Sequence, residues 1–222
     1  MNGSEFLAPA EFIDSGAPAV EAFAREAAGS AADPREKALR LYKAVRDGIV
    51  YDPYINFGDA AFYRASSVIE RGRTFCVGKA ALLAAVARAS GIPARVGYAD
   101  VKNHMTSRRL YELMKTDEFI WHSYAELHLN GRWVKATPAF DLALCEKVGL
   151  KPLDFDGETD SLFHEFDPAG KRHMEYLRDR GTYADVPFDV LMAEFRKYYP
   201  QLFHAGHLGG EFSNEAVAGE LG

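Results

Sequence analysis

The sequence predicts a single α+β domain, in which helices pack on an antiparallel sheet. Residues 74–93 carry apolar side chains at helical spacing. Residues 121–138 alternate apolar and polar side chains on both sides of Asn130 and Gly131, which is the pattern of a β-hairpin. With 222 residues, the chain is long enough for one sizeable core, and two small domains are the weaker alternative.

The composition is that of an ordinary globular chain, with 48% apolar and 26% charged residues. The net charge is −6 and no basic run is present, which argues against nucleic acid and anionic membranes as partners. No secretory signal and no stretch of transmembrane length is visible, so we expect a cytoplasmic protein, although a mature exported protein would look the same.

The first helical signals come early in the chain. Residues 1–32 are predicted to be a lead-in of small and polar residues, with one short helix around 19–28. A longer helix is then predicted to begin at Asp33, which has the residue type of an N-cap and is followed by Pro34 at the first helical position. Its apolar stripe ends near Gly48, so we expect this helix to pack on the core.

The helix predicted after Cys76 is the most apolar of the chain. A short helix and a loop over residues 67–73 lead into it. Gly91 is placed to cap its C-terminus, and Pro93 prevents its continuation. Cys76 therefore lies at or next to the N-terminus of a mostly buried helix.

A cysteine at a helix N-terminus has two interpretations. Unpaired backbone N–H groups and the helix dipole favour a negative charge there, and the thiolate is the nucleophilic form of cysteine. The alternative is a small buried core cysteine, which is the commoner fate of an isolated one. Cys145 is expected to be such a buried residue, and both thiols are expected to be reduced. No CxxC or HxxxH spacing occurs, so we expect no metal and no cofactor.

The hairpin places a histidine on the sheet. Residues 94–98 are predicted to form a strand, and residues 100–119 a polar, partly helical excursion before the next one. With a two-residue turn, Leu129 pairs with Arg132, and His122 shares its face with every second residue of its strand.

Two polar residues follow on or beyond the partner strand. Thr137 becomes a diagonal neighbour of His122. If the chain stays extended beyond Pro138, Asp141 lies on the same face at the other diagonal. Either side chain is thus a candidate partner for the imidazole.

The C-terminal part is predicted to extend one domain that spans residues 33–200. From about residue 150 the extension is expected to be helical, with one helix over 171–180 and another that begins near Asp185. Residues 201–222 are expected to form a flexible tail.

Combined, these elements have the order of a Cys-His-Asp acyl-transfer site. A cysteine begins a helix, a histidine follows on a strand, and a polar residue suited to orient the imidazole comes after it. In such a site the thiolate attacks a carbonyl carbon, and the imidazole carries the proton. A backbone N–H at the helix start would stabilise the oxyanion.

Three sequence blocks resemble the transglutaminase-like superfamily, and together they cover roughly residues 33–141. They are DPREKALRLYKAVRDGIVYD, RTFCVGKAALLAAVARASGIPARVGY and WHSYAELHLNGRWVKATPAFD. The resemblance implies a papain-like core, in which the nucleophile helix packs on an antiparallel sheet. It also implies that Cys76 is the nucleophile and that His122 is the general base and acid.

The third position departs from the family pattern. The motif Trp-Val-x-x-Asp-Pro has Asp where this chain has Thr137. A threonine hydroxyl accepts a hydrogen bond from the imidazole but carries no charge to stabilise imidazolium. Either Asp141 has taken over, which we favour because it restores the charge, or Thr137 acts more weakly, or the site is impaired.

The expected activity is cysteine-dependent acyl transfer or hydrolysis at an amide or peptide bond, through a thioester intermediate, with hydrolysis of a peptide-like amide favoured. The main alternative is a catalytically impaired domain that binds peptides or proteins in the old cleft. A dedicated acyltransferase with a carrier-bound thioester donor is a third, weaker alternative.

Overall fold

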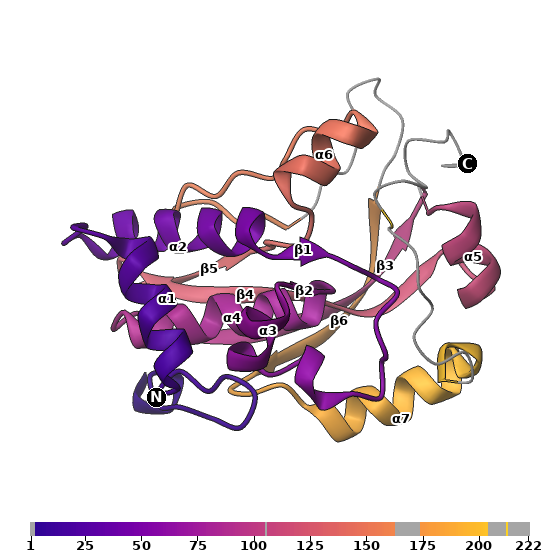
Figure 1. The fold of residues 1–222 in the computed structure, drawn as a ribbon, viewed down its shortest axis with the longest axis horizontal. Helices are drawn as coiled ribbons and strands as arrows, with labels where there is room; N and C mark the ends of the chain where they lie inside the picture. The colour runs from indigo at the N-terminus through magenta and orange to yellow at the C-terminus, as the bar shows by residue number, and fades with distance from the viewer. Residues whose placement is uncertain (1–2, 105, 163–173, 204–211, 213–222) are drawn as a thin grey trace.

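The computed structural model describes residues 3–104, 106–162, 174–203 and 212, and its fold is α+β as predicted. The central helix α4 (Cys76–Ala89) packs against two strands of a four-stranded sheet, and further helices pack on α4 (Figure 1). Those helices are α1 (Pro18–Ala28), α2 (Pro34–Gly48) and α3 (Ala65–Arg71). The side chains of α4 from Cys76 to Arg88 are all buried, so α4 forms the centre of the core.

The N-terminal helices begin where the sequence signals lie. Asp33 caps α2, because its carboxylate accepts the backbone N–H of Glu36 at 2.9 Å, and Pro34 is the first helical residue. The short helix predicted around 19–28 is α1. The start of α2 thus confirms that local capping chemistry sets this boundary, whereas α1 begins after Ala17 without a side-chain cap.

The sheet is antiparallel, and its strand order is β5-β4-β3-β6. The predicted hairpin register is confirmed, since Leu129 pairs with Arg132 and Ala125 with Ala136 across the Asn130-Gly131 turn. The four strands of the sheet are β3 (Ala94–Asn103), β4 (Glu118–Leu129), β5 (Arg132–Ala136) and β6 (Met174–Tyr183). A separate parallel pair, β1 (Val50–Tyr51) and β2 (Arg73–Thr74), leads into α4.

The prediction of a helix over residues 171–180 is wrong for its described part. Residues 174–180 lie in β6, which pairs with β3 on the side opposite β4. The pairing satisfies the backbone groups of β3 at an edge that would otherwise be open. Gly181, which resembled a helix cap, lies instead at an irregularity of the strand, where its φ is +84°. The extension from residue 150 is therefore only partly helical.

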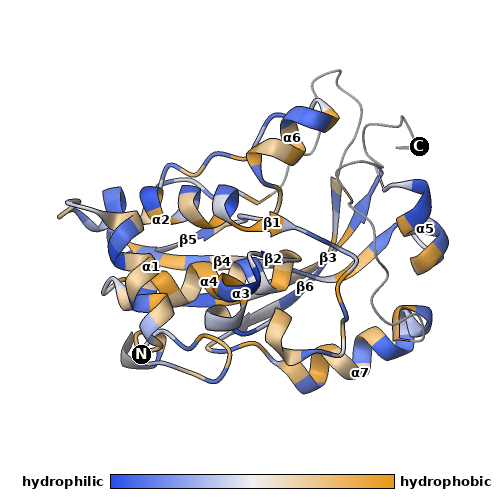
Figure 2. Cartoon of the chain, viewed as in Figure 1, coloured by the Kyte–Doolittle hydropathy of each residue, from blue (hydrophilic) through white to orange (hydrophobic). Residues whose placement is uncertain are grey.

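The shorter elements complete the domain around this framework. The outer helix α7 shows alternating orange and blue bands in Figure 2, because it buries Leu191, Met192 and Phe195 and exposes its polar face. The remaining elements are α5 (Arg108–Met114), α6 (Leu142–Val148), α7 (Phe188–Tyr198) and the 3-10 turns η1 (Gly3–Phe6), η2 (Ala60–Phe62) and η3 (Pro200–Phe203). All but η3 and Phe212 of the predicted tail 201–222 lies outside the described residues.

Asp185, just before α7, anchors part of the N-terminal lead-in. Its carboxylate accepts the backbone N–H groups of Glu11, Phe12 and Ile13 at 2.9 to 3.3 Å. Ile13 is completely buried, so the N-terminal lead-in is anchored in the core next to the start of α7.

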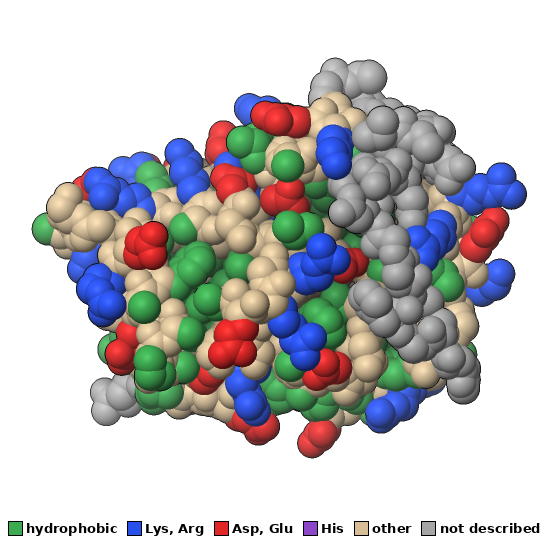
Figure 3. All heavy atoms as spheres, viewed as in Figure 1, with side chains coloured by type: hydrophobic (Ala, Val, Ile, Leu, Met, Phe, Trp, Pro, Cys, Tyr) green, Lys and Arg blue, Asp and Glu red, His purple; other side chains and the backbone are tan. Residues whose placement is uncertain are grey.

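Acidic and basic side chains are interspersed on the face of the molecule shown in Figure 3, so the described residues form no large patch of one charge there. Within the described part of the chain, no helix is both long enough and apolar enough to cross a bilayer.

Candidate active site

Cys76 is the first residue of α4, and tight packing fixes this helix start. The preceding residue, Phe75, provides no side-chain cap, so the first N–H groups of α4 remain available. A Cβ atom at Gly78 would lie 2.2 Å from the carbonyl oxygen of Phe62 and 2.4 Å from Oγ1 of Thr74. Only glycine therefore lets the first turn of α4 approach the chain this closely.

His122 lies on β4, opposite Ala99 of β3, next to an irregularity of the sheet. Trp121, just before it, has a φ of +57°, which is rare for a bulky residue and marks local strain. The Trp121 N–H donates to Oδ1 of Asp100 at 3.0 Å, and Arg180 holds the same carboxylate through a contact of 2.8 Å. This buried ion pair fixes the backbone that carries His122.

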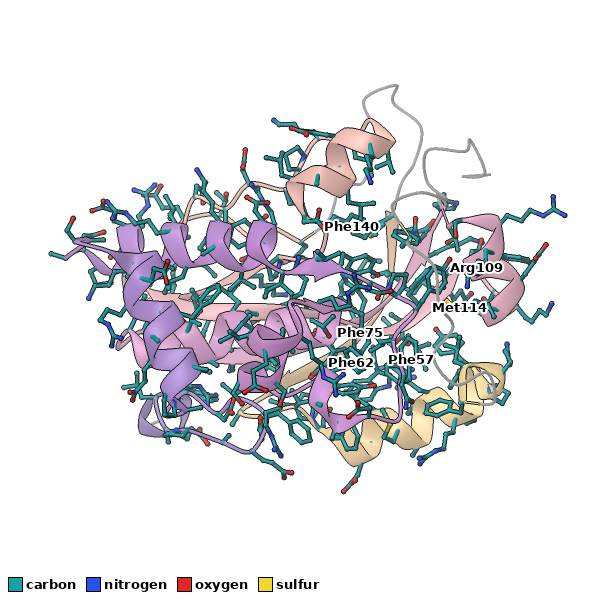
Figure 4. The ribbon with its side chains drawn as sticks, in the orientation of Figure 1. Phe57, Phe62, Phe75, Arg109, Met114 and Phe140 are labelled. Carbon is teal, nitrogen blue, oxygen red and sulfur yellow. The ribbon has the colours of Figure 1, made fainter. Side chains whose placement is uncertain are left out.

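Cys76 and His122 line one cavity, whose empty volume, with its open mouth included, is about 450 Å³. Among the wall residues, Phe57 and Phe75 pack edge to face at 5.2 Å, and Met114 reaches the cavity from α5 (Figure 4). The other wall residues are Tyr51, Pro53, Leu110, Phe119, Ile120, Trp121, Phe195, Tyr199 and Leu202. The structure thus brings the two predicted residues together in an apolar environment.

Burial determines the protonation of both groups. It raises the pKa of the Cys76 thiol to about 11, although hydrogen bonds from the backbone N–H groups of Ser123, Val77 and Cys76 itself act in the opposite direction. It lowers the pKa of the His122 imidazole to about 4. The helix start does favour the thiolate, as expected, but the loss of solvation is larger. At neutral pH the resting site holds a neutral thiol and a neutral imidazole.

A testable consequence is the pH dependence of alkylation. In a Cys145→Ala background, the rate of Cys76 alkylation by iodoacetamide is expected to rise about tenfold per pH unit between about pH 6 and pH 9, because the thiolate fraction does so below a raised pKa. The measurement is the second-order rate by peptide mass spectrometry. A rate that is flat above about pH 5 would instead reveal a preformed thiolate–imidazolium pair.

The two candidates for the third position have different surroundings. Thr137 lies just past β5, and its buried Oγ1 finds no hydrogen-bond partner among the described residues. Asp141 caps α6: its Oδ1 accepts the N–H of Leu144 at 2.9 Å, and its Oδ2 accepts the N–H of Tyr51 at 3.0 Å. Regular strand structure ends at Ala136 and the chain bends at Phe140, so strand parity does not fix the side on which Asp141 lies. Its assignment as the third member stays a prediction.

Sequence reasoning missed a lysine beneath the site. Lys79 lies one turn after Cys76 and is completely buried, and its Nζ donates to the carbonyl oxygens of Arg46 at 2.7 Å and Ile49 at 2.6 Å. Burial lowers its pKa to about 7, while Asp141 acts in the opposite direction. Lys79 thus ties the end of α2 to the base of the site. A lysine within an apolar helix was the only available signal.

Two other polar residues of the hairpin, Glu126 and His128, contact side chains of neighbouring strands. Glu126 pairs with Arg95 at 2.6 Å, and the rings of His128 and Trp133 pack at 5.1 Å. Within the described ranges, no group of three or more His, Cys, Asp or Glu side chains is arranged to hold a metal ion.

Comparisons with known proteins give one family. A model of the transglutaminase-like superfamily matches residues 21–138. Among solved structures, the chain is similar to a proposed cysteine protease from Cytophaga hutchinsonii, with 20% identity, a TM-score of 0.45, and coverage of 80% of this chain and 53% of that one. A proposed protease from Parabacteroides distasonis has 14% identity, a TM-score of 0.37, and coverage of 56% and 23%, respectively. No curated protein matches the chain.

The chain therefore spans about half of the first of these structures and a smaller share of the second. The arrangement of α4 on an antiparallel sheet is the papain-like core that the resemblance implied. Since the family model covers more than half of its residues, this chain belongs to the transglutaminase-like superfamily.

Proposed function

We propose that this chain is a cysteine-dependent enzyme that cleaves or transfers an acyl group at an amide or peptide bond. The sulfur of Cys76 attacks the carbonyl carbon while His122 accepts the thiol proton, since both groups are neutral at rest. The resulting imidazolium gives that proton to the departing amine, which leaves a thioester on Cys76. Water or a second amine then attacks the thioester and restores the thiol.

One observation carries this proposal: Cys76 and His122 come from separate elements and line the same cavity. The backbone N–H of Ser123, next to His122, also donates to the Cys76 sulfur. The N–H groups at the start of α4 face the sulfur as well, and they are the natural donors for the oxyanion of the tetrahedral intermediate.

For the third member we retain Asp141, with Thr137 as the alternative. Asp141 would stabilise the imidazolium by its charge, from a position fixed by the cap of α6 and by the N–H of Tyr51, a wall residue. Hydrolysis of a peptide-like amide is the favoured outcome. A reducing compartment such as the cytoplasm suits a free thiol nucleophile.

The competing function is a peptide-binding module that has lost its chemistry. The observation that favours it is Thr137, which stands where the family motif has Asp. The module would keep the apolar cavity but would form no covalent intermediate.

Trapping the thioester distinguishes these functions. A p-nitrophenyl ester of an N-acetylated amino acid is mixed with the protein, the reaction is quenched in acid, and the adduct is located by peptide mass spectrometry. We expect one acyl group on Cys76, an unchanged adduct in Cys145→Ala, and acylation slowed by at least about 100-fold in His122→Ala. Equal slow labelling of both cysteines, or a rate indifferent to His122, would support the binding module.

A further inference from the structure

We propose that the cavity beside Cys76 is a pocket for the side chain of the acyl donor, and that it selects a large, apolar and uncharged one. This inference rests on the proposed acyl-transfer function and adds its substrate class. The carbonyl carbon must lie at the Cys76 sulfur when the bond forms, which places the side chain of the acyl group within reach of the adjoining cavity.

The wall explains the selectivity for uncharged groups. Apart from Cys76 and His122, every described residue that lines it is apolar or aromatic, and none carries a charge at neutral pH. The hydroxyl of Tyr199 is already engaged: it accepts the N–H of Ile120 and donates to the carbonyl oxygen of Glu118, both at 2.7 Å. Tyr199 therefore offers its ring to a bound group, and a substrate lysine or glutamate would find no charged partner among the described wall residues.

The apolar lining of this open cavity explains the selectivity for bulk. Only about 40 Å³ of it has room for the centre of a water-sized group, so a bound side chain would lie against the walls near the mouth. A hydrogen atom or methyl group would leave most of this apolar surface in contact with water or empty space. A leucine or phenylalanine side chain would cover more of it, and such a difference in burial corresponds to a factor of about 10 to 100 in rate or affinity.

The wall also shows why this selectivity belongs to this chain. Phe195 comes from α7, Tyr199 from the C-cap of α7 and Leu202 from η3, and all three lie beyond the family-matched residues 21–138. The C-terminal extension thus supplies one side of the pocket. A family member with another extension would present a different wall to the same pair of reacting side chains.

A substrate series tests the inference. N-acetylated p-nitrophenyl esters of Gly, Ala, Leu, Phe, Glu and Lys differ only in the acyl side chain, and the measured quantity is the second-order rate of Cys76 acylation. We expect the Leu and Phe esters to react about 10 to 100 times faster than the Gly ester, and the Glu and Lys esters no faster than Gly. Rates within about threefold of one another, or fastest for a charged ester, would overturn the inference. Absence of acylation by every ester would instead overturn the proposed function itself.

A pair of variants links the selectivity to the pocket. Met114→Ala enlarges the cavity and is expected to shift the optimum from Leu towards Phe and naphthylalanine, with a change in the rate ratio of about tenfold. Met192→Ala is the matched control, because Met192 is equally buried on α7 but does not line the cavity. Its ratios should stay at the wild-type values. Identical changes in both variants would attribute the effect to lost stability and refute the pocket.

Discussion

Replacing His122 by alanine is expected to lower kcat/KM for amide hydrolysis by about 10²- to 10⁴-fold, the usual contribution of a positioned general base. The loss is large here because the Cys76 thiol has a raised pKa, so almost no thiolate exists at neutral pH without a base to take its proton. Steady-state hydrolysis of an anilide substrate measures the effect. His128→Ala is the control, since His128 lies on the same strand but packs on Trp133; its rate should stay within about twofold.

The same assay assigns the third member. If Asp141 stabilises the imidazolium, Asp141→Asn should lower kcat by a factor of ten or more, and Thr137→Val should have little effect. If Thr137 orients the ring, the order is reversed, and Thr137→Asp should raise kcat. Because Asp141 also caps α6 and holds the N–H of Tyr51, each variant is compared by thermal unfolding before its kinetics are interpreted.

The Gly78→Ala variant is expected to lose about 3–5 kcal/mol of folding free energy, although alanine is normally the better helix residue. The new methyl group would overlap the Phe62 carbonyl and the Thr74 hydroxyl, which form a buried hydrogen bond at 2.6 Å. Relief requires breaking that bond or shifting the start of α4, and with it Cys76.

Urea unfolding measures this loss, and Gly48→Ala provides the control. Gly48 ends α2, and a Cβ atom added there would have nothing within 4 Å, so alanine should be neutral or stabilising by up to about 1 kcal/mol. A Gly78→Ala protein as stable as the wild type would show that the first turn of α4 has room for a methyl group.

Features that depend on nearby residues could be predicted from the sequence. The Asn130-Gly131 turn admits few backbone conformations, so it fixed the register of β4 and β5. Asp33 and Pro34 set the start of α2 by local capping, independently of the rest of the fold. The prediction that Cys76 begins a helix and that His122 lies on a strand is confirmed, and both residues line one cavity.

Features that depend on distant packing could not be predicted. Residues 174–180 have enough charged residues to resemble a surface helix, and only the open edge of β3 explains why they form a strand. The course of the chain between Thr137 and Asp141 likewise depends on its contacts, and the alternation of side chains along the strand does not predict it. The raised pKa of the Cys76 thiol depends on distant packing for a similar reason, because side chains from α5 and α7 help to enclose the start of α4.

The carboxylate of Asp185, just before α7, holds residues 11–13 near the start of the chain through hydrogen bonds to their backbone N–H groups. These hydrogen bonds bear on where a fragment of this chain can begin and end. A fragment trimmed to residues 21–138 would lose both the donors and the acceptor of these hydrogen bonds, and one side of the cavity, although it retains Cys76 and His122. The packed structure of this chain therefore extends beyond the residues that the family model matches.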